Sequence, residues 1–505
     1  MLLPVLLLLT FLFFKFFQNR RKFANFYRIR QKCVAEFEKI SGLPSVPILG
    51  STFYFERKNP MEGRRAADLR QMGFAAEHDG YGVTKIWIGP VPHALVVRGE
   101  TAKLIFDSSI NTYKPTSYRK LQEWIGEGLL TSSGEKWRSR RKLLTQTFHF
   151  KVLQQYQKVF VAQGKILVDV LQLRANGQIA FDILPYLKRC AFDIICETAM
   201  GVPIGSQRGA NSEYLRSVDR LTELVSAYQY YPLNWFKPFW YLTGKGFEFD
   251  RHVKSSSELT KKVIEERKKI PIDMEGKLAF LDLLLQEKSL SDEDIREEVE
   301  TFMLAGHETT AMASNFTIWF LGQHPKYQKK VHEELDEVFG EDFDREPTTE
   351  ELKSLVFLDQ CIKETMRVIS IAPFISRELI EDVIVPHPTK EPLILPAGLQ
   401  VTINLNVIMK DAKHFERPME FYPAHFDPDR TAARPPFAYI PFAAGPRNCI
   451  GQKYAMNELK STLSWVFRRF SVESVTRYPD EVPVVAITSR PINGTMVVLK
   501  NRRKL

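Results

Sequence analysis

The start of the chain differs from the rest in its pattern of apolar and polar positions. Residues 1–17 are almost wholly apolar and are interrupted only by Pro4, Thr10 and Lys15. As a helix this run spans about 25 Å, close to the hydrocarbon thickness of a thin endoplasmic-reticulum bilayer. Basic residues follow it between Arg20 and Lys32, so the positive-inside rule leaves the remainder of the chain in the cytosol.

A cleaved signal peptide is the alternative interpretation of this run. Such a peptide carries positive charge before its apolar segment and small residues at a cleavage site after it, and neither is present. We therefore predict a membrane anchor at residues 1–19, followed at residues 20–50 by a basic flank and a proline-containing hinge. Residues 51–505 are predicted to form a single domain.

After the hinge the apolar positions follow strand-like and then helical spacing. Residues 83–88 and 94–97, separated by a Gly-Pro-Val-Pro-His segment, predict two strands of a small sheet. The chain then becomes mainly helical. Ser291 and the acidic residues after it predict the start of a helix that continues to about Gly322.

Composition narrows the class of protein. A length of 505 residues suggests about three domains, but no Gly/Ser-rich linker, low-complexity tract or repeat divides the chain, so one large domain is the better prediction. The apolar fraction of 44% supports a sizeable core. The net charge of +10 suits anionic lipid headgroups or an acidic protein partner. No recognition motif supports nucleic acid as a partner.

The cysteines indicate a reducing compartment. There are five, and none shows C-x-x-C spacing: Cys33, Cys190, Cys196, Cys361 and Cys449. An odd number without metal-type spacing is typical of reduced thiols that face the cytosol.

Cys449 lies in a turn built from glycines and a proline. A helix-like run follows at once, so the cysteine lies at or just before a helix N-terminus, where backbone N–H groups favour a thiolate. Arg447 adds a cation that can pair with an anionic ligand, and Gly445 and Gly451 allow close approach of a flat group. On these residues alone, Cys449 is a nucleophile, a metal ligand or a buried structural cysteine.

Residues 442–451 resemble, at every fixed position, the haem-binding signature F-x-x-G-x-R-x-C-x-G of the cytochrome P450 family. The resemblance implies the cytochrome P450 fold, mostly α with a smaller β part, with haem between a long central helix and the cysteine loop. It implies haem b with Cys449 as the axial thiolate on iron. It also implies that Arg447 binds a propionate and that Phe442 and Gly451 lie against the haem.

Further segments match motifs of the same family. Trp137 and Arg141, four residues apart on a predicted helix, match W-x-x-x-R, which implies an indole at the porphyrin edge and a guanidinium on a propionate. The alternative is an amphipathic surface helix. Arg377 matches an arginine that contacts a propionate in relatives. Glu364 and Arg367 match E-x-x-R and imply a buried pair that braces the cysteine loop. His425 departs from the family, which usually carries arginine there.

The predicted long helix contains Ala-Gly-His-Glu-Thr-Thr at residues 305–310, which matches A-G-x-[D/E]-T. Glycine and threonine form helices poorly, which favours a local opening of the helix. The resemblance places Ala305 and Gly306 over the distal haem face. It implies that Thr309 hydrogen-bonds the oxygen being activated and that Glu308 helps to relay protons. The alternative is a packing glycine with satisfied threonines.

Within the family, the chain most resembles the family-4 fatty-acid ω-hydroxylases, through residues 126–132 and 298–303 and the dipeptide at 149–150. The resemblance implies a monooxygenase that inserts one oxygen atom into a C–H bond of a lipophilic small molecule. Many family-4 relatives esterify a haem methyl group through a glutamate where this chain has Ala305, so no covalent haem ester is expected.

No nicotinamide- or flavin-binding fingerprint is visible, so electrons are expected from NADPH–cytochrome P450 reductase, with cytochrome b5 as a second candidate donor. The expected location is the endoplasmic reticulum membrane, with the catalytic domain cytosolic. Three alternatives remain: a steroid or xenobiotic hydroxylase, a reductase-independent haem-thiolate isomerase or dehydratase, and a membrane haem-binding protein without turnover.

Overall fold

The computed structural model describes residues 2–46, 49–52, 80–148, 150–271, 279–481 and 483–502. Helices make up most of it: α1 (Leu2–Phe37), α3 (Gly99–Phe106), α4 (Arg119–Ile125), α5 (Gly134–Thr145), α6 (Phe150–Gln172), α7 (Leu184–Thr198), α8 (Ser212–Tyr230), α9 (Lys237–Leu242), α10 (Lys245–Lys268), α11 (Phe280–Gln286), α12 (Asp292–Gln323), α13 (Pro325–Phe339), α14 (Thr349–Ser354), α15 (Val356–Val368), α16 (Leu405–Ile408), α17 (Pro428–Ala433) and α18 (Gln452–Arg469).

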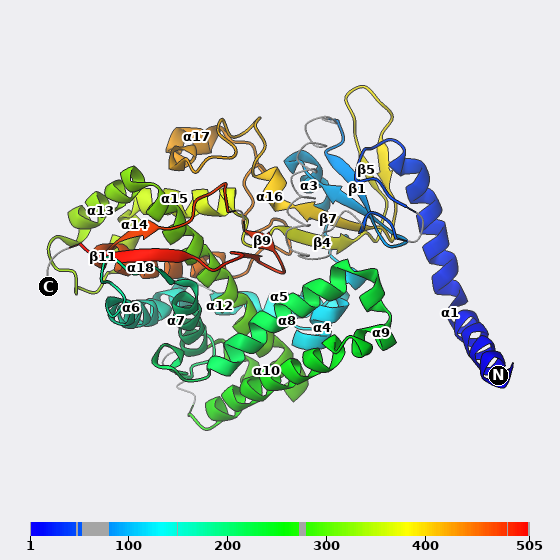
Figure 1. Cartoon of the computed structure of the whole chain (residues 1–505), viewed down its shortest axis with the longest axis horizontal. Helices are drawn as coiled ribbons and strands as arrows, with labels where there is room; N and C mark the ends of the chain where they lie inside the picture. Colours follow the sequence, from blue (N-terminus) through cyan, green and yellow to red (C-terminus); the bar gives the residue numbers. More distant parts are fainter. Residues whose placement is uncertain are drawn as a thin grey trace.

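The strands form small sheets. They are β1 (Val83–Ile88), β2 (Val91–Val96), β3 (Phe181–Asp182), β4 (Phe374–Glu378), β5 (Val383–Val385), β6 (Leu393–Leu395), β7 (Gln400–Asn404), β8 (Phe470–Ser474), β9 (Val484–Val485), β10 (Ser489–Arg490) and β11 (Met496–Asn501). The largest sheet has the order β1-β2-β7-β4, with β2 and β7 parallel. Figure 1 shows this sheet on the side where α1 joins the body, with the helices gathered on the other side. The mostly α fold with a smaller β part is therefore confirmed.

Helix α12 is the central element. Its N-cap Ser291 accepts a hydrogen bond from the Asp294 N–H, and the Asp294 side chain accepts one from the Ser291 N–H. This capping box satisfies N–H groups that would otherwise lack a partner. The helix is buried around most of its circumference and packs against α7, α15 and α18. Its predicted extent, from Ser291 to about Gly322, is confirmed within one residue.

The second predicted strand begins earlier than expected. The hairpin between β1 and β2 closes at the pair Ile88↔Val91, so Val91 to His93 belong to β2 instead of the connection. Gly89 adopts φ +57° in the turn, a conformation that glycine reaches without strain, and this permits the tight connection. His93 thereby becomes a strand residue.

The N-terminal region is only partly described. The predicted anchor at residues 1–19 is described from Leu2 as the backbone of helix α1, whereas Met1 and the side chains of residues 2–17 and Asn19 lie outside the described part of the chain. Among the helices that are described, none is long and apolar enough to cross a membrane. Helix α1 continues through the basic flank to Phe37, where Cys33 and Phe37 are buried in the core of the sheet.

The predicted hinge is also partly outside the described residues, since these exclude Pro47 and Ile48. On either side of this gap, Gly42 forms an isolated bridge with Lys85, and Gly50 forms one with Ile88. The hinge segment thus runs along the outer edge of β1.

Candidate functional site

One cavity of about 360 Å³ brings the predicted residues together from separate parts of the chain. Helix α5 contributes Trp137 and Arg141, β4 contributes Arg377, and α12 contributes Ala305, Gly306, Glu308 and Thr309. The loop before α18 contributes Phe442, Arg447, Cys449 and Gly451. The residues selected from the sequence motifs are therefore neighbours in space.

The cysteine loop is fixed by its backbone. The Cys449 N–H donates to the Phe442 carbonyl over 2.9 Å. Gly445 has φ +70°, and a Cβ there would lie 1.8 Å from the Phe106 carbonyl oxygen, so only glycine fits. Helix α18 begins at Gln452, which confirms that Cys449 immediately precedes a helix.

The Cys449 side chain is accessible from the cavity but lies deep among protein atoms. Burial raises the pKa of the Cys449 thiol, while the Gly451 N–H and the nearby Arg141 act in the opposite direction. The protein groups alone therefore do not make the thiolate the favoured form. A bound metal cation is what shifts such a thiol to the thiolate.

Arg447 and Trp137 form one wall of the cavity. The Arg447 guanidinium donates to the carbonyls of Thr112 at 2.7 Å and Ser132 at 2.8 Å. Its central carbon lies 4.7 Å from the centre of the Trp137 ring. Within the chain as described, the buried indole N–H of Trp137 forms no hydrogen bond of its own, although the ring lines the cavity. It is a donor available to a ligand.

Three further cations line the same cavity. Arg141 donates to the Asn448 carbonyl at 2.7 Å and to its side-chain oxygen at 2.6 Å. Arg377 is 3% exposed and donates to the Ser376 carbonyl. The ammonium of Lys114 lies 4.3 Å from the centre of the Tyr118 ring.

Within the described part of the chain, these cations lack a negative partner. Burial lowers the pKa of Arg447 to about 9 and holds that of Lys114 well below its usual range, and the neighbouring arginines add to both effects. Burial also lowers the pKa of Arg141 and of Arg377. Among the residues described, no carboxylate forms an ion pair with any of the four. A buried excess of positive charge is stable only with an anion nearby, so the site fits a ligand that carries carboxylates.

Helix α12 forms the wall opposite the cysteine loop, and it does not open locally as the sequence predicted. It is α-helical throughout. The Thr309 and Thr310 hydroxyls donate to the carbonyls of Ala305 and Gly306, each at 2.8 Å, without interrupting the helix. A Cβ at Gly306 would lie 2.6 Å from the Ile195 side chain, so this glycine also permits the close approach of α7. His307 is buried against the ring of Phe192, as a helix-packing histidine.

Glu308 points into a charged network. Its Oε1 accepts hydrogen bonds from Arg490 at 2.6 Å and from Thr488 at 3.1 Å, and its Oε2 lies 3.0 Å from the Lys188 ammonium. Asp219 on α8 pairs with both cations. Arg490 and Lys188 together outweigh burial and hold the pKa of Glu308 far below its usual range, so its carboxylate is ionised at neutral pH.

The buried Glu364–Arg367 pair near the cysteine loop forms, although this chain has His425 where the family usually carries arginine. Arg367 donates to both carboxylate oxygens of Glu364 at 2.8 Å, and both side chains are fully buried. His425 Nδ1 lies 3.1 Å from Glu364 Oε1. Since a carboxylate only accepts, the imidazole donates here. Arg367 also donates to the Pro418 and Glu420 carbonyls, which ties α15 to the segment before the cysteine loop.

Several of these residues could not be identified from the sequence. Lys114, Lys188, Asp219 and Arg490 belong to no recognised motif, and the charged partners of the last three lie far away along the chain. Lys114 precedes a proline in a loop, and Arg490 lies in a strand of two residues. No local spacing marks either one.

Comparison with known proteins agrees with this geometry. The profile of the family described as Cytochrome P450 matches residues 41–496. Cytochrome P450 4V2 of Mus musculus is 40% identical over 498 residues, which cover 93% of this chain and 91% of the relative. Cytochrome P450 4c3 of Drosophila melanogaster is 35% identical over 526 residues, with 99% and 95% covered. The crystal structure of the cytochrome P450DA heme domain shares the fold, with a TM-score of 0.77 and 21% identity over 92% of this chain and 98% of that one.

Proposed function

We propose that this member of the cytochrome P450 family hydroxylates a fatty acid or related lipid. The chain belongs to that family and is a haem-thiolate monooxygenase of its family-4 group. The electrons come from NADPH through a separate reductase. The observation that carries the proposal is that Cys449 and Thr309 line one cavity together with four cations that form no ion pair among the described residues: Lys114, Arg141, Arg377 and Arg447.

The residues present fit haem. Cys449 is placed to ligate the iron, whose positive charge offsets the cost that burial imposes on a thiolate. Arg141, Arg377 and Arg447 are placed to hold the propionates, and the free indole N–H of Trp137 adds a donor. Phe442, Gly451, Ala305 and Gly306, which line the cavity, would lie against the faces of the porphyrin.

Haem supplies the redox chemistry, in which two electrons and two protons split O₂, one oxygen atom enters the C–H bond and the other leaves as water. The protein positions the substrate and delivers protons. The Thr309 hydroxyl donates its proton to the Ala305 carbonyl, and its oxygen can still accept a hydrogen bond. We propose that it releases this carbonyl and turns its proton toward the oxygen that is reduced. Glu308 is proposed to help to relay protons toward this hydroxyl, which requires that its carboxylate first releases Arg490 or Lys188 to take up a proton.

The haem is proposed to be haem b without an ester link to the protein. Ala305 has no carboxylate, and the carboxylate of Glu308 is already bound by Arg490, Thr488 and Lys188. Retention therefore depends on Cys449, the propionate contacts and packing.

Two features support the choice of substrate and partners. The cavity is lined largely by apolar side chains, among them Leu304, Ala313 and Ile371, which suits a hydrocarbon chain. The apolar run at residues 1–17 and the basic flank after it support an anchor in the endoplasmic reticulum membrane. There the proposed donors are NADPH–cytochrome P450 reductase and cytochrome b5.

The test is reconstitution with reductase, NADPH and O₂, followed by mass spectrometry over fatty acids, sterols and xenobiotics. Hydroxylated fatty acid formed in proportion to NADPH and O₂ consumed supports the proposal. A hydroxylated sterol or xenobiotic in its place supports the alternative substrate classes. Product formed without reductase or O₂ supports a haem-thiolate isomerase.

A further inference from the structure

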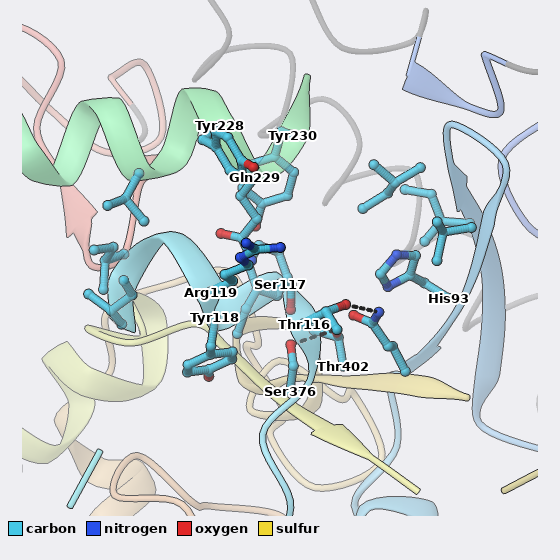
Figure 2. A pocket seen from close by; sticks show the side chains of 18 of the residues that line it. His93, Thr116, Ser117, Tyr118, Arg119, Tyr228, Gln229, Tyr230, Ser376 and Thr402 are labelled. Carbon is cyan, nitrogen blue, oxygen red and sulfur yellow. Dashed lines mark hydrogen bonds between the residues drawn. The ribbon is translucent and has the colours of Figure 1, made fainter. Parts of the chain in front are cut away.

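A second cavity, of about 410 Å³, adjoins the one that contains Cys449. It lies between the inner face of the sheet formed by β1, β2, β7 and β4, the segment that leads into α4, and the end of α8 (Figure 2). Four residues line both cavities: Tyr118, Leu121, Phe374 and Ile487. The two cavities therefore share a wall.

One polar side chain in this second cavity has no partner. His93 on β2 is only 7% exposed, and across the described parts of the chain it forms no hydrogen bond and no ion pair. Figure 2 shows its imidazole projecting from the strand into the pocket. Burial lowers the pKa of His93 to about 4, so the ring is neutral and offers one N–H donor. Because the ring faces the cavity, its N–H is available to a ligand that enters there.

Some of the other polar groups in this cavity are paired with each other, and one buried acceptor, Gln400 Oε1, has no partner among the described residues. Gln400, opposite His93 on the neighbouring strand, donates to the Thr116 hydroxyl over 2.8 Å. The hydroxyls of Ser376 and Thr402 are also 2.8 Å apart. Gln400 Oε1 can only accept a hydrogen bond, whereas the neutral ring of His93 has an N–H that can donate one to an anion.

The charge of the second cavity is positive. Arg119 is a lining residue, and no aspartate or glutamate is among the described residues that line the cavity. Arg119 has Glu123 at 3.8 Å, but both side chains are largely exposed, and a surface pair of this kind contributes little. An anionic group in the cavity would meet a cation and no like charge.

We propose that the second cavity binds the carboxylate head of a long-chain fatty acid, with His93 donating a hydrogen bond to it and Arg119 balancing its charge. The acyl chain then passes between Tyr118 and Phe374 toward Cys449. The proposal rests on the proposed function and adds to it the place of the head group. It fits the apolar remainder of the lining, which includes Ile86, Leu95 and Val225, since an acyl chain needs such a surface while its head needs donors.

The experiment compares hexadecanoic acid with its methyl ester, which has the same chain but no charge. Binding is measured on the haem-loaded protein, without reductase, by the change of haem spin state and by displacement of a fluorescent fatty acid. The variants are His93→Phe, which keeps a ring of similar size, and Arg119→Gln. Arg138→Gln is the matched control, because Arg138 is an exposed arginine outside both cavities.

We expect His93→Phe to weaken binding of the acid by about tenfold, the usual loss for one hydrogen bond to a charged group. Arg119→Gln should weaken it by about threefold, because an exposed cation contributes less. Binding of the ester and the haem content should change by less than about twofold, by the same reasoning on an uncharged group. The control should leave both ligands unaffected. Arg119 is exposed, so Arg119→Gln stays informative even where His93→Phe lowers the yield of folded protein.

Equal losses for acid and ester, or no loss of acid binding in either variant, would overturn this inference while leaving fatty-acid hydroxylation intact. If the wild-type protein binds neither ligand, the proposed function fails and this inference fails with it. The two failures are thus distinguishable.

Discussion

The Glu308 carboxylate on α12 accepts a hydrogen bond from Arg490 on β10 over 2.6 Å, although 182 positions separate the two residues in sequence. Lys188 on α7 approaches the other carboxylate oxygen to 3.0 Å. One carboxylate therefore joins three elements around the cavity. Because two cations face it, its charge is balanced within the buried network, and its removal leaves those cations with Asp219 alone.

Glu308→Gln is expected to destabilise the protein by about 3–5 kcal/mol, the usual cost of removing one member of a buried ion pair. Chemical denaturation followed by circular dichroism measures this. The control is Glu333→Gln, whose side chain on α13 is 61% exposed and should leave the free energy of unfolding within about 0.5 kcal/mol. A Glu308→Gln protein as stable as the wild type contradicts the network's role.

The same network predicts a dependence on pH. The pKa of Glu308 is lower in the folded protein than in the unfolded chain, so its contribution to stability is present above the ordinary carboxyl pKa and is lost as the pH falls through the folded value. The difference in stability between the wild type and Glu308→Gln should therefore be constant near neutral pH and shrink in acid. A difference in stability that grows on acidification would contradict the predicted direction of the pH dependence.

Thr309→Ala is expected to uncouple the reaction. NADPH consumption continues while hydrogen peroxide replaces the hydroxylated product, because the hydroxyl proposed to steer the second proton is gone. Thr317→Ala is the matched control: its hydroxyl makes the same kind of bond, 2.8 Å to the Ala313 carbonyl, away from the cavity. Equal coupling in both variants would mean that Thr309 acts only within the helix.

Arg377→Met should separate haem binding from protein stability. Removing a buried cation that has no negative partner should leave the apoprotein at least as stable as the wild type. Haem should be lost about tenfold faster, since a charge-assisted hydrogen bond contributes about 1.5–3 kcal/mol. Transfer of haem to apomyoglobin measures the rate, and thermal melting of the apoprotein measures stability. An unchanged rate of haem loss would show that Arg377 does not contact a propionate.

Acid denaturation followed by solvent extraction should release unmodified haem, because Ala305 offers no carboxylate for an ester. Haem that stays with the polypeptide would show that another carboxylate reaches the ring. Mass spectrometry of the extracted haem distinguishes the two results.

The sequence predicted the residues whose spacing is local. The cysteine loop, Trp137 with Arg141, and Glu364 with Arg367 each lie within a short motif, and the structure brings these motifs together. The predicted start of the second strand and the predicted local opening of α12 were wrong. A glycine turn brought His93 into β2, and the threonine hydroxyls closed back onto their own helix.

The residues that the sequence did not reveal act across long separations. Lys188 and Arg490 meet Glu308 only after α7, α12 and β10 have packed together. The available donor of His93 likewise becomes apparent only when the second cavity forms around it. Charge partners and cavities of this kind have no spacing rule in the chain, so only the folded structure reveals them.

The most direct test of the account is the absorption spectrum of the ferrous–CO complex of Cys449→His beside that of the wild type. The wild type should show the red-shifted band that thiolate ligation gives. The variant should lose this band, because an imidazole replaces the sulfur ligand, while the apoprotein fold is retained by circular dichroism. An unchanged red-shifted band in Cys449→His would contradict the assignment of Cys449 as the iron ligand and with it the proposed site.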